Sequence, residues 1–229
     1  MYNINPNMFM IRPFHLVETG YSIFVILISL VIYFRTRHMY KLTEHKGIKY
    51  FSYTFLFFAI AYLFRFVSRI LFRLIFDPTT IRSFPREYLR FGDLIFIYAS
   101  VMSGLFLLYS VIWKKIKLKE KTVILFFNIF AIIAMLFDFF LRNPFIHISM
   151  ITILFFATVI ISFNKSKKSK KKHPFYVAYV LIFLIWILNL ISIEISKFLH
   201  ELRFGIYVVS CVIYILILLR VLKINKKKK

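Results

Sequence analysis

The sequence predicts an all-α integral membrane protein, a bundle of seven transmembrane helices with the N-terminus outside and the C-terminus inside. Of the 229 residues, 61% are hydrophobic, whereas soluble globular domains are about 45–50% apolar. Apolar runs of about 20 residues recur along the whole chain, and each is long enough to cross about 30 Å of hydrocarbon. The runs lack the polar–apolar alternation of barrel strands, so we expect helices, which satisfy their own backbone hydrogen bonds in lipid.

Seven segments qualify as spans, and together they make residues 1–229 a single transmembrane domain without a soluble domain. The division between the fourth and fifth spans rests on Arg142-Asn143-Pro144 alone. Without it, one helix of about 60 Å would run through twice the bilayer thickness, and proline also suits the first turn of a new helix. The predicted spans are about 15–34, 50–76, 93–113, 122–141, 144–163, 174–195 and 204–222.

The orientation follows from the lysines and arginines between the spans, because short basic loops stay on the cytoplasmic side. The first, third and fifth loops and the tail are the richer set. They carry Arg35, Arg37, Lys41, Lys46, Lys49, Lys114, Lys115, Lys117, Lys119, Lys121, Lys165, Lys167, Lys168, Lys170, Lys171, Lys172, Lys223 and Lys226 to Lys229. The opposite side has only Arg12, Arg82, Arg86, Arg90, Arg142, Lys197 and Arg203. We therefore expect the tail in the cytosol.

The strong positive charge fits a membrane surface better than nucleic acid. Lysine and arginine number 32 against 9 acids, a net charge of +23, but the basic residues lie in short loops and not on one face of a folded domain. We expect no nucleic acid partner and an attraction to anionic lipids at the inner face. The predicted location is the cell membrane. In a eukaryote it would be the endoplasmic reticulum if the final lysines, which resemble a dilysine retrieval signal, act as one.

Several membrane chemistries lack the residues that they need. The last span, 204–222, contains no lysine to form a Schiff base with retinal, so no retinal is expected. Cys211 is the only cysteine, which excludes an intramolecular disulfide and a thiolate metal cluster. His200-Glu201 has no second histidine one helical turn away, as a zinc protease requires. We therefore expect that the protein is not an enzyme and that it binds no metal and no cofactor.

Ionisable residues inside the spans gather in the predicted outer half. A charge at the centre of a span costs about 2.5–3.5 kcal/mol, so each one needs a partner or a role. The second span carries Arg65, Arg69 and Arg73 at intervals of four residues, on one helical face that Tyr62 shares. At similar depth lie further polar residues of other spans, namely Glu18, Asp93, Asp138, His147, Asn189 and Glu194. The inner half is nearly free of ionisable groups.

This segregation predicts a pocket that opens outward above an apolar inner plug. Arg65 and Arg69 have the guanidinium geometry that binds a carboxylate or phosphate in two places, and Trp186 is a candidate for the pocket floor. The candidate ligand-binding residues are Arg65, Arg69, Tyr62, Glu18, Asp138, His147, Asn189 and Trp186. The structural alternative is that Arg65 pairs with Asp138 or Glu18 to set helix packing, that Asp138 pairs with Arg142, and that Arg73 extends to the interface.

The function that these features favour is a sensor or receptor-like module. An anionic small molecule would bind from outside and shift the bundle between two arrangements, which a cytosolic signalling protein would detect at the basic loops. One alternative is a small transporter of an anionic solute, and another is an accessory or scaffold subunit that binds a membrane partner and no ligand. A transporter requires a path through the apolar inner half; an accessory subunit requires only the ion pairs.

Overall fold

A computed structural model describes residues 13–75, 86–116, 118–141, 144–168, 175–195 and 200–226, and these residues form seven α-helices. The predicted all-α fold is therefore confirmed. The helices are α1 (Pro13–Thr43), α2 (Lys46–Ile75), α3 (Arg86–Ile112), α4 (Glu120–Leu141), α5 (Pro144–Lys168), α6 (Tyr176–Ile195) and α7 (His200–Lys226).

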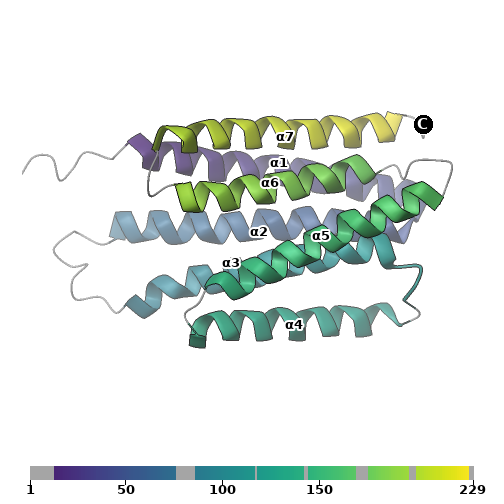
Figure 1. Ribbon diagram of the computed structural model, residues 1–229, viewed down its shortest axis with the longest axis horizontal. Coiled ribbons are helices and arrows are strands. Elements are labelled where there is room, and N and C mark those ends of the chain that lie inside the picture. The colour runs from purple at the N-terminus through teal and green to yellow at the C-terminus, as the bar shows by residue number, and fades with distance from the viewer. Residues whose placement is uncertain are drawn as a thin grey trace, which may run out of the picture.

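Six of these helices are long and apolar enough to cross a membrane: all except α6, whose described apolar part, Tyr176–Ile191, is shorter. The protein is thus a polytopic helical protein of the membrane type. Successive helices run in opposite directions, so the start of α1 and the end of α7 lie at opposite ends of the bundle (Figure 1). The count of seven spans and the outward N-terminus remain predictions.

The two ends of the bundle differ in charge. Helices α1, α3 and α5 finish where α2, α4 and α6 begin, at the right of Figure 1, and we call this the lysine-rich end. Its described basic residues include Lys49, Lys115 and Lys165. We call the opposite end, where α1, α3, α5 and α7 begin, the lysine-poor end. The orientation predicted from the sequence would place the lysine-rich end in the cytoplasm.

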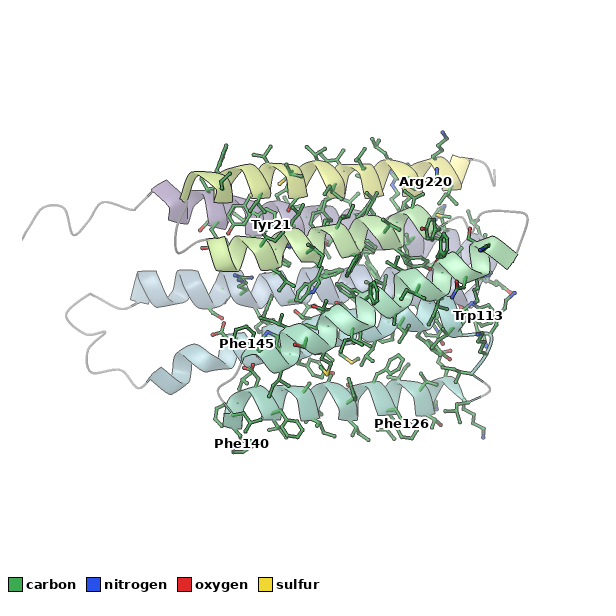
Figure 2. The ribbon with its side chains drawn as sticks, in the orientation of Figure 1. Tyr21, Trp113, Phe126, Phe140, Phe145 and Arg220 are labelled. Carbon is green, nitrogen blue, oxygen red and sulfur yellow. The ribbon has the colours of Figure 1, made fainter. Side chains whose placement is uncertain are left out.

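Six of the seven helices form a closed ring, and α4 lies outside it. Contacts join α1 to α2, α2 to α3, α3 to α5, α5 to α6, α6 to α7, and α7 back to α1, whereas α4 contacts only α3 and α5 strongly. Helix α4 accordingly forms the lower edge of the bundle in Figure 1. Phe126 and Phe140 on its outer side are 59% and 74% exposed (Figure 2). These rings face the position that lipid would occupy.

The helices extend past the predicted spans. Hydropathy identifies the apolar residues that would lie within the hydrocarbon of a membrane, and a helix can continue beyond them. Residues 15–34 were expected for the first span, but α1 continues to Thr43, and the expected loop 35–49 shrinks to Glu44 and His45. Glu44 has a φ of 51°, the left-handed conformation that ends a helix, and its N–H bonds to the carbonyl of Tyr40 at 2.8 Å. This two-residue connection ties α1 closely to α2.

Helices α4 and α5 are separate, as the residues before Pro144 predict. Helix α4 ends at Leu141 and α5 begins with Pro144 in its first turn, where the missing N–H of proline costs no hydrogen bond. Glu120 in the first turn of α4 favours the positive end of the helix dipole. It also forms an ion pair with Lys49 of α2 at the lysine-rich end.

Candidate functional site

An ion pair joins α1 and α2 within the ring. The Nη2 atom of Arg65 lies 3.7 Å from Oε1 of Glu18, and the two side chains are 25% and 15% exposed. This separation exceeds that of an ordinary N–H···O hydrogen bond, about 2.7–3.2 Å. The Arg65 guanidinium also lies 5.2 Å from the centre of the Phe96 ring of α3, at a distance where a cation is attracted to an aromatic face.

The position of Arg65 depends on an unusually close approach of α2 and α3. Ser68 follows Arg65 by three residues, and Gly92 precedes Phe96 by four, so both lie about one helical turn away. A Cβ atom at Gly92 would lie only 2.5 Å from Cβ of Ser68. The absence of a side chain at Gly92 therefore allows the contact that brings the Arg65 cation to Phe96.

A small cavity of about 20 Å³ lies at the centre of the ring beside this ion pair. All ring helices except α1 line it, and α4 does not. Its lining residues are Phe58, Tyr62, Phe96, Ser100, Phe155, Ile182, Ile185, Trp186, Asn189 and Tyr214. Since a water molecule needs about 10–15 Å³ by this measure, the cavity has room for about one water. Aromatic rings and a few polar groups thus surround a nearly closed space.

Helix α1 reaches the cavity wall through Tyr21, which is 5% exposed. Its hydroxyl donates a hydrogen bond to Oδ1 of Asn189 at 3.2 Å. Its ring stacks on Tyr207 of α7 with centroids 4.5 Å apart, and meets Tyr62 edge to face at 6.0 Å. Figure 2 shows Tyr21 in the region where α1, α6 and α7 pack together. All six ring helices therefore contribute to one polar and aromatic cluster.

Towards the lysine-rich end, a layer of buried rings closes the interior. This aromatic layer consists of Tyr50, Phe51, Phe106, Tyr109, Phe175 and Tyr179, each less than 5% exposed. The rings of Tyr50 and Tyr109 lie 4.4 Å apart, and those of Phe51 and Phe175 lie 4.8 Å apart. The hydroxyls of Tyr179 and Ser110 are within hydrogen-bond distance at 3.0 Å. The ammonium group of Lys49 lies over the ring of Tyr50, 5.9 Å from its centre, at the edge of this layer.

Five of the eight candidate ligand-binding residues come together around the cavity. Tyr62, Trp186 and Asn189 line it, and Arg65 pairs with Glu18 next to Tyr62. The indole Nε1–H of Trp186 donates a hydrogen bond to Thr152 of α5 at 2.8 Å, which holds the ring against the cavity. The sequence suggests Asp138 or Glu18 as the partner of Arg65, and in the structure the partner is Glu18.

Two of the remaining candidates, Asp138 and His147, lie apart from the cavity. Asp138 of α4 and His147 of α5 pair with each other, with Oδ1 and Nδ1 at 2.7 Å, and neither lines the cavity. Asp138 thus contacts His147, while its other considered partner, Arg142, lies outside the described residues. The side chains of Arg69, Arg73 and Glu194 also lie outside the described part. Asp93 is exposed on α3.

Several residues of the cluster were not expected from the sequence. Tyr21 and Tyr214 were not singled out, nor was Thr152 or the ring of Phe96. One signal was available, because Tyr207 and Tyr214 are seven residues apart and so share a face of the last span. A tyrosine in the middle of a span also needs a hydrogen-bond partner more than a phenylalanine does.

Comparison with known proteins finds a similar protein, but its description names no activity. A protein of Archaeoglobus fulgidus described as an uncharacterized protein is 29% identical over 214 residues, which are 90% of this chain and 91% of that one. The similarity therefore extends over nearly the whole of both chains. No family model matches the sequence, and no solved structure matches it.

Proposed function

We propose that this protein is a receptor-like sensor that binds a small anionic molecule at Arg65, in competition with Glu18. The observation that carries the proposal is the Glu18–Arg65 pair at 3.7 Å, beside a cavity lined by five helices. In this proposal the lysine-poor end faces outward, and the lysine-rich end presents its basic residues to a cytosolic signalling partner.

The geometry of the pair supports exchange of Glu18 for a ligand. A carboxylate or phosphate that binds both guanidinium nitrogens makes hydrogen bonds of about 2.7–2.9 Å, shorter than the 3.7 Å between Arg65 and Glu18. The ligand anion would keep Arg65 neutralised and release the Glu18 side chain. Since Glu18 belongs to α1 and Arg65 to α2, the exchange removes an attraction between these two helices.

The route for a signal follows from the connection between the same two helices. Only Glu44 and His45 join α1 to α2 at the lysine-rich end. The imidazole of His45 packs edge to face on Trp113 of α3, with centroids 5.3 Å apart. A tilt of α1 relative to α2 therefore moves the surface that a cytosolic partner would contact. A ligand shifts the bundle only as far as it prefers the tilted arrangement.

The aromatic layer favours sensing over transport. It fills the ring between the cavity and the lysine-rich end with side chains that are nearly all fully buried. An anion crossing it would have to separate close-packed rings, and the cation beside them, Lys49 over the ring of Tyr50, is already paired with Glu120. We therefore expect ligand binding without net flux across the membrane.

Fluorescence of Trp186 provides a direct test. A Trp113→Phe variant leaves Trp186 as the single tryptophan, at the wall of the cavity. This variant, reconstituted in nanodiscs, is titrated with acetate, succinate, inorganic phosphate and sulfate at constant ionic strength, with glucose as the neutral control. We expect a saturable emission change with one class of anion. The same anion should show no uptake into proteoliposomes above that of empty vesicles.

Three variants made in the Trp113→Phe background assign the response to the ion pair. Arg65→Gln should abolish the saturation, and Glu18→Gln should lower the half-saturating concentration because the competing carboxylate is gone. The matched control is Arg35→Gln, which removes an exposed arginine of the lysine-rich end and should change nothing. An unchanged titration for Arg65→Gln would refute the assigned site.

The small cavity supports a second candidate, an accessory subunit in which the pair only sets helix packing. About 20 Å³ is far below the roughly 300–1,000 Å³ of organic ligand pockets, so the sensor needs Glu18 and nearby rings to move. An accessory subunit predicts that no anion saturates the Trp186 response. It also predicts that Arg65→Leu weakens folding and recovery of a co-purifying membrane partner together.

A further inference from the structure

A second and larger cavity lies at the lysine-rich end, away from the ion pair. Its volume is about 550 Å³, and it is lined by Lys115, from the turn after α3, and by Ile161, Asn164, Lys165 and Lys167 of α5. This volume falls in the range of small-molecule sites, about 300–1,000 Å³.

The charge of the cavity is wholly positive. Three of its five lining residues are lysines, and the described ion pairs include none of them. The carboxylate of Glu120, in the first turn of α4, is engaged by Lys49 of α2. Like charges held close together repel each other, so an anion between the three ammonium groups would relieve the repulsion.

Lys165 is held in position by the end of α3. Its Nζ donates a hydrogen bond to the backbone carbonyl of Val111, one of the last carbonyls of a helix, which have no partner within the helix. An ammonium group has three N–H donors, so Lys165 retains two for a ligand. The bond also joins α5 to α3 and fixes the wall of the cavity.

The cavity combines this positive charge with an apolar wall at the level of a membrane interface. Ile161 lies one turn before Lys165 on α5, and the exposed rings of Phe156 and Phe163 add apolar surface on another side of that helix. Trp113, seen at the lysine-rich end in Figure 2, is of the type that lies at the headgroup level. A molecule with an anionic head and apolar chains matches these surroundings.

We propose that this cavity is a binding site for the phosphate headgroup of an anionic phospholipid. Lys115, Lys165 and Lys167 bind the phosphate oxygens, Asn164 donates a further hydrogen bond, and the acyl chains follow the apolar face of α5. The bound lipid joins the turn after α3 to the end of α5, and thereby stabilises the end of the ring that faces the basic surface.

Native mass spectrometry of the full chain in detergent tests the site, with phosphatidylglycerol and phosphatidylcholine of equal acyl chains as probes. The wild-type protein should bind one phosphatidylglycerol at a concentration at least about tenfold lower than phosphatidylcholine. The triple variant Lys115→Gln, Lys165→Gln and Lys167→Gln should lose this preference.

The matched control carries Lys41→Gln, Lys119→Gln and Lys223→Gln, three exposed lysines of the same end outside the cavity. It loses the same charge and should keep the preference. If it loses as much binding as the cavity variant, the attraction is a general surface effect and the site is refuted.

Two further measurements keep the test decisive. Ile161→Trp fills the cavity with the charge intact and should also displace the lipid, so the proposal is tested even if the triple lysine variant misfolds; undiminished binding would refute it. Competition with inorganic phosphate at millimolar concentration separates the two sources of phosphate. Retention of phosphatidylglycerol is expected, and its complete release would overturn the lipid in favour of a soluble phosphate.

Discussion

Replacing Gly92 by alanine places a methyl group inside the contact between α2 and α3. The new Cβ would lie 1.6 Å from Oγ and 2.5 Å from Cβ of Ser68. Rotation of Oγ relieves the first overlap, but it breaks the hydrogen bond of Ser68 to the carbonyl of Phe64 at 2.6 Å. The second overlap remains, because carbon atoms in contact lie about 3.5–4.0 Å apart.

The two helices must therefore separate by about 1 Å at this point. Overpacking of this kind costs about 1–3 kcal/mol, while alanine in place of glycine favours a helix by up to about 1 kcal/mol. Gly20 of α1 provides the matched control, because a Cβ there meets nothing within 4 Å. We expect Gly92→Ala to be less stable than Gly20→Ala by about 1–3 kcal/mol, since both share the helix-propensity gain.

Cys211 makes the measurement straightforward. It is the single cysteine, half-buried on α7, so a thiol-reactive fluorogenic dye reports the loss of the folded ring on heating. Adding Ser68→Gly to Gly92→Ala removes both overlapping atoms and should recover most of the lost stability. Adding Ser68→Ala leaves the Cβ contact and should recover less. If Gly92→Ala proves as stable as Gly20→Ala, α2 and α3 do not approach as closely as described.

Three other features of the structure can be tested with the same dye assay. His147→Leu leaves Asp138 without the partner 2.7 Å away and should lower the free energy of unfolding by about 1–2 kcal/mol; a second change, Asp138→Leu, should restore most of it, and a simple sum of two losses would contradict the pairing. Trp186→Phe and Thr152→Val each break the same hydrogen bond and should cost about 1 kcal/mol each, with the double variant costing less than their sum. Glu44→Gly should stabilise the protein by about 1 kcal/mol, because glycine adopts a φ of 51° without a Cβ penalty; a lower unfolding temperature would argue against this conformation.

The helical class and the approximate elements were predictable because hydropathy measures a physical requirement for crossing lipid. The arrangement of the helices was not predictable in the same way. In a membrane both the packed and the lipid-facing sides of a helix are apolar, so the sequence of α4 does not differ in pattern from that of any other span. Its place outside the ring appears only in the structure, where Phe126 and Phe140 are exposed.

The sequence indicates how deep in the bundle each candidate residue lies. It does not indicate which way the side chain points around the helix axis. Position along a span placed Glu18 and Arg65 in the same half, and their pairing was among the expected alternatives. Asp138 has a similar depth, yet it lies on α4 outside the ring and contacts His147 instead. The role of Tyr21 depends on its contacts with Asn189 of α6 and Tyr207 of α7. The sequence does not show that α1 packs against these two helices.

The closure of the ring between its first and last helices has a consequence for the order of assembly during synthesis. Tyr21 and Asn189 are 168 positions apart, and Tyr214 of α7 completes the cavity wall. A ribosome thus delivers α1 long before its neighbours α6 and α7 exist. Until they arrive, the tyrosine hydroxyl of α1 lacks its asparagine acceptor, and the interior of the nascent bundle stays open along one side. The cavity is consequently complete only once α7 has packed against the other helices.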